Sequence, residues 1–241
     1  MSSVATHAQL STLRRISWPR PEWWSLGLCF AAWLLILWKT VPGSASHGHL
    51  HHAATGPGPE PFLTQTFWWF VMVVAMMFPL LPAHIRNTAA RSLWARRHRA
   101  IGAFLAGYVA PWMLFGTAAV GILFALELSR TVTGLIGFSA AFIWQVMPAR
   151  RRTVLACHRT RPIAPVGLRA DYDCVRYGWM VGNNCVLSCW ALMLACLLFG
   201  HSIVAMIGLT AIGLIERSTP RPKQLLAISV IGGLGLLQLI W

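Results

Sequence analysis

The side chains of this chain that are best suited to chemistry carry sulfur and follow one another along a single apolar segment. Cys185, Cys189, Met193 and Cys196 are spaced four, four and three residues apart. In a helix with 3.6 residues per turn this spacing places them on one face. Thiolate and thioether sulfur are the donors that Cu(I) prefers. The stripe therefore indicates a soft-metal site, although cysteine and methionine also serve as ordinary packing residues between helices.

A second apolar segment offers further ligands. It contains three methionines followed by a proline: Met72, Met76, Met77 and Pro79. The first two share a helix face, and their position in the segment predicts the same depth as Cys189 and Cys185. The proline leaves a backbone carbonyl without its helical donor, which is tolerated where a helix lines a cavity. Asn183 and Asn184 are expected to be buried beside the thiols and favour a metal role over packing.

Imidazole is concentrated in one Gly/Pro-rich stretch, which contains His47, His49, His51 and His52. Such a segment captures Cu(II), Ni(II) or Zn(II), with the alternative that it is a solvated linker. His201, directly after the sulfur-bearing segment, is expected at the same outer side. Cys157-His158 forms a weaker candidate for a cytosolic thiol–imidazole site.

The elements that position these residues are apolar helices. The composition is 56% hydrophobic and only 11% charged, whereas soluble domains carry about 25% charged residues. Segments long enough to cross a bilayer, or nearly so, are Trp23–Val41, Phe62–Pro82, Ile101–Leu126, Thr131–Met147, Trp179–Phe199, Ser202–Ile215 and Leu225–Trp241. The sequence predicts an all-α, multi-pass membrane bundle of about seven helices that forms a single domain over residues 1–241.

The distribution of basic residues predicts the orientation. With the N-terminus in the cytoplasm, every Lys and Arg except Lys39 and Arg130 lies on the cytoplasmic side, as the positive-inside rule requires. The outer His-rich loop is then residues 43–61, and the Arg-rich cytoplasmic loops are 83–100 and 148–178. The expected location is the bacterial inner membrane. The net charge of +14 is attributed to this topology and to anionic lipid, and no nucleic-acid partner is expected.

Several functional classes lack the residues they need. The acidic residues are few and lie in loops or near the ends of the apolar segments, so no intramembrane acid–base pair and no hard-metal site are expected. The chain has no Gly-rich phosphate loop. The sequence therefore favours a binding or transfer function without bond chemistry, and an enzyme is not expected.

Several motifs together resemble a known family. They are Met72-x-x-x-Met76-Met77-x-Pro79, Gly107-Tyr108 with Trp112, Gln145 before Pro148, Cys157-His158, and Gly182-x-x-Cys185-x-x-x-Cys189-Trp190-x-Leu192-Met193. The pattern, from about Trp68 to Arg217, is similar to that of bacterial predicted metal-binding integral membrane proteins, some described as copper chaperones for copper oxidases such as tyrosinase. The resemblance implies metal-handling roles for Met76, Met77, Cys185, Cys189 and Met193.

This chain departs from the family pattern at two positions. Ser188 stands where many relatives have a second cysteine, and His201 stands where many have methionine. The leading hypothesis is a copper chaperone that collects copper at the outer histidines, as Cu(II). It would hold Cu(I) between helices and deliver it to an apo copper enzyme. A copper permease and a metal-free structural or assembly protein are the alternatives.

Overall fold

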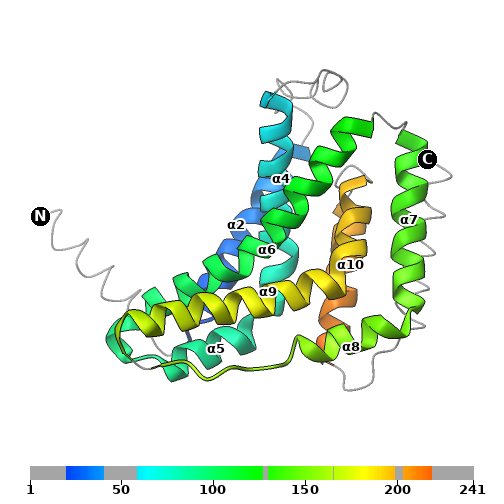
Figure 1. Cartoon of the computed structure of the whole chain (residues 1–241). Coiled ribbons are helices and arrows are strands. Elements are labelled where there is room, and N and C mark those ends of the chain that lie inside the picture. The colour runs from blue at the N-terminus through cyan, green and yellow to red at the C-terminus, as the bar shows by residue number, and fades with distance from the viewer. Residues whose placement is uncertain (1–19, 41–58, 127–129, 165, 199–202, 219–241) are drawn as a thin grey trace, which may run out of the picture.

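The computed structural model describes residues 20–40, 59–126, 130–164, 166–198 and 203–218. These residues form an all-α structure (Figure 1), which confirms the predicted fold class. Its α-helices are α2 (Trp23–Thr40), α4 (Pro59–Met77), α5 (Pro82–Arg91), α6 (Arg97–Leu126), α7 (Arg130–Val146), α8 (Pro148–Ala156), α9 (Gly167–Leu198) and α10 (Ile203–Ser218). The short 3-10 helices are η2 (Phe78–Leu80) and η3 (Trp94–Arg96).

Helices of membrane-spanning length are present where the hydropathy predicts them. Among the described residues, four stretches are long and apolar enough to cross a bilayer: Trp23–Thr40, Pro61–Leu80, Trp94–Leu126 and Gly167–Leu198. The predicted fourth and sixth segments coincide with α7 and α10, which are shorter. The predicted seventh segment, Leu225–Trp241, lies outside the described residues.

Two segments predicted as loops contain helices. Helix α5 occupies much of residues 83–100, and α8 lies within 148–178. Helix α9 begins at Gly167 rather than at Trp179, because its polar first turns bury residues at helical spacing and pair Asp171 with Arg99 at 2.7 Å. Hydropathy does not detect such turns, since their stabilising contacts are charged.

Helices α6 and α9 approach each other closely through glycine. A Cβ added at Gly107 would overlap the backbone of Val175, and one at Gly178 would overlap the backbone of Phe104. A Cβ at Gly182 would overlap the carbonyl of Tyr108. Small residues allow this backbone contact between apolar helices. The contact brings the Tyr108 side chain to the sulfur-bearing face of α9.

The methionine-bearing helix α4 ends at a proline. Pro79 has no N–H to donate to the carbonyl of Ala75. That carbonyl instead accepts hydrogen bonds from Trp33 Nε1 at 3.1 Å and from Cys29 Sγ at 3.3 Å, both on α2. The predicted free carbonyl thus exists, and it joins α4 to α2. Helix α4 stops at Met77, which becomes the last residue before the 3-10 turn.

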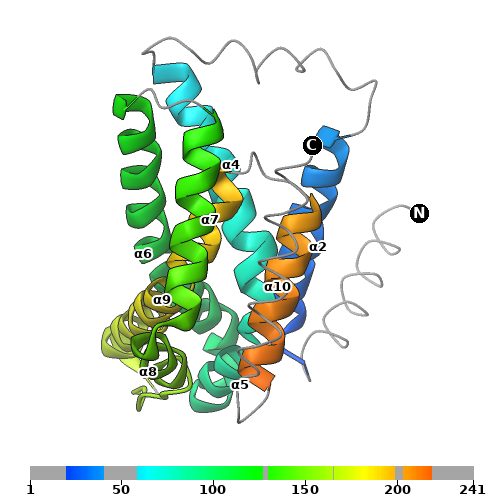
Figure 2. The ribbon, with the colours of Figure 1, turned by 90° about the vertical axis from the view of Figure 1, so that its right-hand side faces the viewer.

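The short helices α5 and α8 lie at one end of the bundle, where α4 and α10 also finish (Figures 1 and 2). We call this end the α5–α8 end. The chain therefore brings residues from five elements to a single region. That region contains Met77, Tyr108, Cys157, Cys185 and Arg217.

Candidate metal site

Cys185 is the centre of the polar contacts at the α5–α8 end. Its side chain is fully buried, and its thiol contacts Met77 Sδ at 3.8 Å. The hydroxyl of Tyr108 donates a hydrogen bond to Cys185 Sγ at 3.1 Å. Thus α4, α6 and α9 each contribute a polar or sulfur atom to one buried point.

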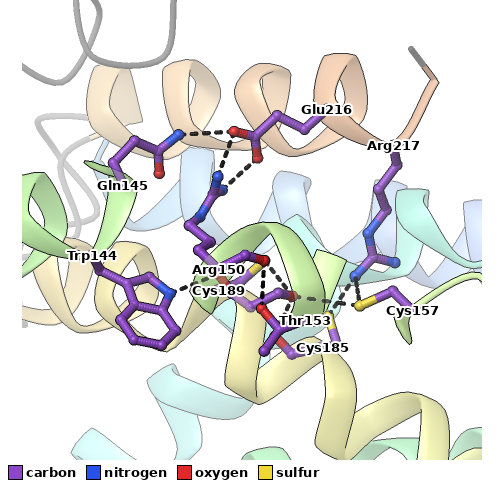
Figure 3. Close-up of polar contacts among 10 residues, drawn as sticks. Trp144, Gln145, Arg150, Thr153, Cys157, Cys185, Cys189, Glu216 and Arg217 are labelled. Atoms are coloured by element: carbon purple, nitrogen blue, oxygen red, sulfur yellow. Dashed lines mark hydrogen bonds and ion pairs between the residues drawn. The ribbon is translucent and has the colours of Figure 1, made fainter. Parts of the chain in front are cut away.

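Arg217 reaches the same sulfur from α10. Its Nη2 donates to Cys185 Sγ at 2.9 Å and to Cys157 Sγ at 3.6 Å (Figure 3). Its Nη1 lies 3.5 Å from the carbonyl of Leu80. No carboxylate among the described residues forms an ion pair with Arg217. A half-buried guanidinium that faces thiols instead of a carboxylate is unusual, because buried cations are normally paired.

Cys189 and Ser188 extend this cluster by one helical turn. Cys189 follows Cys185 by four residues on the same face of α9 and is buried like it. Ser188 Oγ donates to the carbonyl of Cys185 at 3.0 Å, and lies 3.4 Å from Cys189 Sγ and 3.5 Å from Cys157 Sγ. The Ser188 hydroxyl therefore lies between two thiols.

An ion pair beside the cluster fixes the position of α10. Glu216 accepts hydrogen bonds from Gln145 Nε2 at 2.8 Å and from Arg150 Nη1 at 2.7 Å, and Arg150 Nη2 also pairs with it. All three side chains are buried. Figure 3 shows the neighbouring side chains of Glu216 and Arg217 reaching separate partners. Glu216 thus holds α10 in the register that presents Arg217 to Cys185.

The second half of the sulfur stripe has apolar surroundings. Met193 and Cys196 are fully buried and belong to the hydrophobic core. Within the part of the chain that the structure describes, neither side chain makes a hydrogen bond. Nearby, Gly137 of α7 packs against Leu198 and Ala195.

The other predicted ligands have different environments. Met72 and Met76 are fully buried in α4, but Met77 is the methionine whose sulfur contacts Cys185. The expectation that both asparagines are buried was wrong. Asn183 is exposed, and the half-buried Asn184 donates to the carbonyl of Ala156 at 3.1 Å, because both lie on the side of α9 away from the stripe.

The predicted histidine ligands, His47, His49, His51, His52 and His201, lie outside the described residues. Among the described residues, no three or more His, Cys, Asp or Glu side chains are grouped as a metal site. The candidate donors are therefore two thiols and a thioether, and Arg217 lies among the sulfur atoms.

Sequence reasoning missed the roles of Tyr108, Arg217 and Gln145. Tyr108 and Gln145 occur in the motifs quoted above, but no chemistry was assigned to them. Arg217 was counted only as a topological charge in a loop. The signal for the close approach that places Tyr108 was the small-residue pair Gly178-x-x-x-Gly182, which favours helix contact.

Two ionisable groups beside the cluster are held neutral by their surroundings. Burial, with a further contribution from the charge of Arg217, lowers the pKa of His84 to about 4. Its Nδ1 lies 2.7 Å from the hydroxyl of Tyr177. Burial also raises the pKa of the Cys157 thiol, although Arg217 partly opposes this effect.

A sequence model of the family described as PpoB2, copper chaperone, matches residues 66–239. The chain belongs to this copper chaperone family. The match includes every helix from α6 to α10 and most of α4, which confirms the family resemblance drawn from the motifs. No curated protein and no solved structure matches the chain.

Proposed function

We propose that this member of the copper chaperone family is an inner-membrane protein of about seven spans that holds Cu(I) between its helices. Cys185 and Cys189 would supply two thiolates and Met77 a thioether. The observation that carries the proposal is the convergence of Met77, Tyr108 and Arg217 on the buried Cys185 thiol. Met72 and Met76 would line the approach to this site, and Met193 would serve packing.

The donor set fits the chemistry of Cu(I). Thiolate and thioether ligands select Cu(I) over harder ions, because both the ion and the ligands are soft. The two cysteines are one helical turn apart and buried, so the site excludes water. Metal binding requires the thiols to lose their protons. Arg217 and the Tyr108 hydroxyl can stabilise the resulting negative charge by hydrogen bonding.

The remaining steps complete a delivery function. The outer histidines at 47, 49, 51 and 52 would concentrate copper as Cu(II). An external one-electron donor, such as a low-molecular-weight thiol, would reduce it to Cu(I), and His201 would receive the Cu(I) at the outer mouth. The protein would then transfer Cu(I) to an apo copper enzyme. It would catalyse no bond chemistry itself, because its described residues contribute ligands and charges rather than an acid–base pair.

A copper permease is the second candidate, and one observation favours it. Cys157 lies within reach of Ser188 and Arg217, so a further thiol lies beside the Cys185 site at the α5–α8 end, which the charge distribution predicts to be cytoplasmic. A path of sulfur side chains to the cytoplasm would also use Met147, which is 44% exposed and so open to the surroundings of the protein. Uptake of copper into proteoliposomes separates the two candidates, since a chaperone moves no copper across the membrane.

The proposal is tested by metal content. Full-length protein with the His47–His52 loop deleted is purified in detergent under reducing conditions from copper-supplied cells, and copper is counted by mass spectrometry. We expect one copper per chain in this parent and none after Cys185→Ser with Cys189→Ser. Cys174→Ser with Cys196→Ser is the matched control and retains copper. Absence of copper from the parent would contradict the proposal and leave the sulfurs as packing residues.

A further inference from the structure

Arg217 is the feature of the candidate site that copper ligation alone does not explain. It supplies no metal ligand, because a guanidinium has only donor groups and stays protonated in proteins. Its hydrogen-bond acceptors are the thiols of Cys185 and Cys157 and the carbonyl of Leu80. The nearest carboxylate in the chain sequence, Glu216, is already engaged by Arg150 and Gln145.

Charge balance gives this arginine a function. Two thiolates with a monovalent ion carry a net charge of minus one, and Arg217 brings the total to zero. Two thiolates with a divalent ion are already neutral, and Arg217 then leaves one uncompensated positive charge. In a water-poor site an uncompensated charge is costly, so the arginine favours the monovalent ion.

We propose that Arg217 makes the Cys185–Cys189 site selective for monovalent soft ions, Cu(I) and Ag(I), over divalent ions such as Zn(II). This inference rests on the proposed function. The geometry that supports it is the 2.9 Å contact to Cys185 (Figure 3). The guanidinium faces sulfur atoms, whereas a buried cation is normally paired with a carboxylate. The ion pair of Glu216 keeps the arginine in this place.

The test measures affinities for Cu(I), Ag(I) and Zn(II) by competition with chromophoric chelators, using the full chain without the His47–His52 loop. Arg217→Met removes the charge with little loss of volume, and Arg217→Lys keeps it. Arg176→Met removes an exposed arginine from α9 and serves as the control for net charge. We expect Arg217→Met to lower the Cu(I)-to-Zn(II) affinity ratio about 100-fold, the effect of one unit charge a few ångströms from the ion.

We expect the Cu(I)-to-Zn(II) affinity ratio of the Arg217→Lys protein to stay within about fivefold of the parent ratio. We expect Arg176→Met to leave the ratio unchanged. An Arg217→Met protein that weakens all three ions equally would overturn the inference, because loss of structure alone has that effect. An equal change in the ratio on Arg176→Met would also overturn it.

Ser188→Cys tests the same charge balance between thiolates, Arg217 and the bound ion without removing the arginine. The serine Oγ lies 3.4 Å from Cys189 Sγ, so a cysteine there supplies a third thiolate and shifts the balance by one charge toward divalent ions. We expect the Cu(I)-to-Zn(II) ratio to fall, and an unchanged ratio would contradict the rule even if Arg217→Met does not fold. A parent protein that binds no Cu(I) would instead sink the proposed function itself.

Discussion

The two halves of the sulfur stripe on α9 share a helix face but have different environments. Cys185 and Cys189 lie among a hydroxyl, a guanidinium and a second sulfur-bearing helix. Met193 and Cys196 are enclosed by the hydrophobic core. Spacing along a helix therefore identifies which residues share a face, whereas the neighbouring helices decide which of them can do chemistry. We assign metal binding to the first half and packing to the second.

The largest expected effect separates these halves directly. Cys185→Ser with Cys189→Ser should lower Cu(I) affinity more than about 1000-fold, because hydroxyl oxygen is a poor ligand for a soft ion. Met193→Leu with Cys196→Ala should change the affinity less than about threefold. The second variant should instead lose about 1–2 kcal/mol of stability from the cavity at residue 196. Chelator competition and thermal unfolding in detergent measure the two quantities, and equal losses of affinity would contradict the division.

The next prediction concerns the scaffold of the first half. Gly182→Ala places a methyl group against the backbone of Tyr108 and should destabilise the protein by about 3 kcal/mol, because two helix backbones must separate. The separation should also weaken Cu(I) binding, since it moves Tyr108 from Cys185. Gly102→Ala on α6 is the control, because a Cβ there meets no atom within 4 Å. Equal melting temperatures for the two variants would contradict the close approach.

Acidification should affect the same end of the molecule through His84. The unfolded chain binds a proton near pH 6.5, whereas the folded protein does not until about pH 4. Stability should therefore fall as the pH drops from about 6.5 to 4, by at most about 3 kcal/mol. His84→Gln should reduce this dependence while keeping a partner for Tyr177. Melting temperatures across this pH range give the test, and an identical pH dependence in both proteins would refute the role of His84.

The smallest expected effect is that of a single hydrogen bond. Tyr108→Phe removes the hydroxyl that donates to Cys185 and should lower Cu(I) affinity about tenfold, the usual value for a hydrogen bond to a charged group. Tyr177→Phe is a chemically matched control, since its hydroxyl contacts His84 rather than a thiol. A larger effect of Tyr177→Phe would place the functional site elsewhere.

The sequence was sufficient to predict the apolar helices and the stripe on α9, because both depend on local periodicity. It also predicted copper, which agrees with the description of the family, whereas the ligands and the oxidation state of the ion stay predictions. It was not sufficient to show that Met77 contacts Cys185, because Pro79 ends α4 and turns the chain there. Nor could it place Arg217, whose position depends on a buried ion pair between α8 and α10. Contacts between distant segments leave no periodic signal.

Copper binding by Cys185, Cys189 and Met77 can be observed by X-ray absorption spectroscopy of the Cu(I)-loaded protein lacking the His47–His52 loop. We expect a first shell of sulfur alone, with two thiolates and a weaker thioether that disappears in Met77→Leu. The Met193→Leu spectrum should match that of the parent. A first shell containing nitrogen or oxygen, or a spectrum changed by Met193→Leu and not by Met77→Leu, would contradict the assignment of copper to the Cys185 half of the stripe.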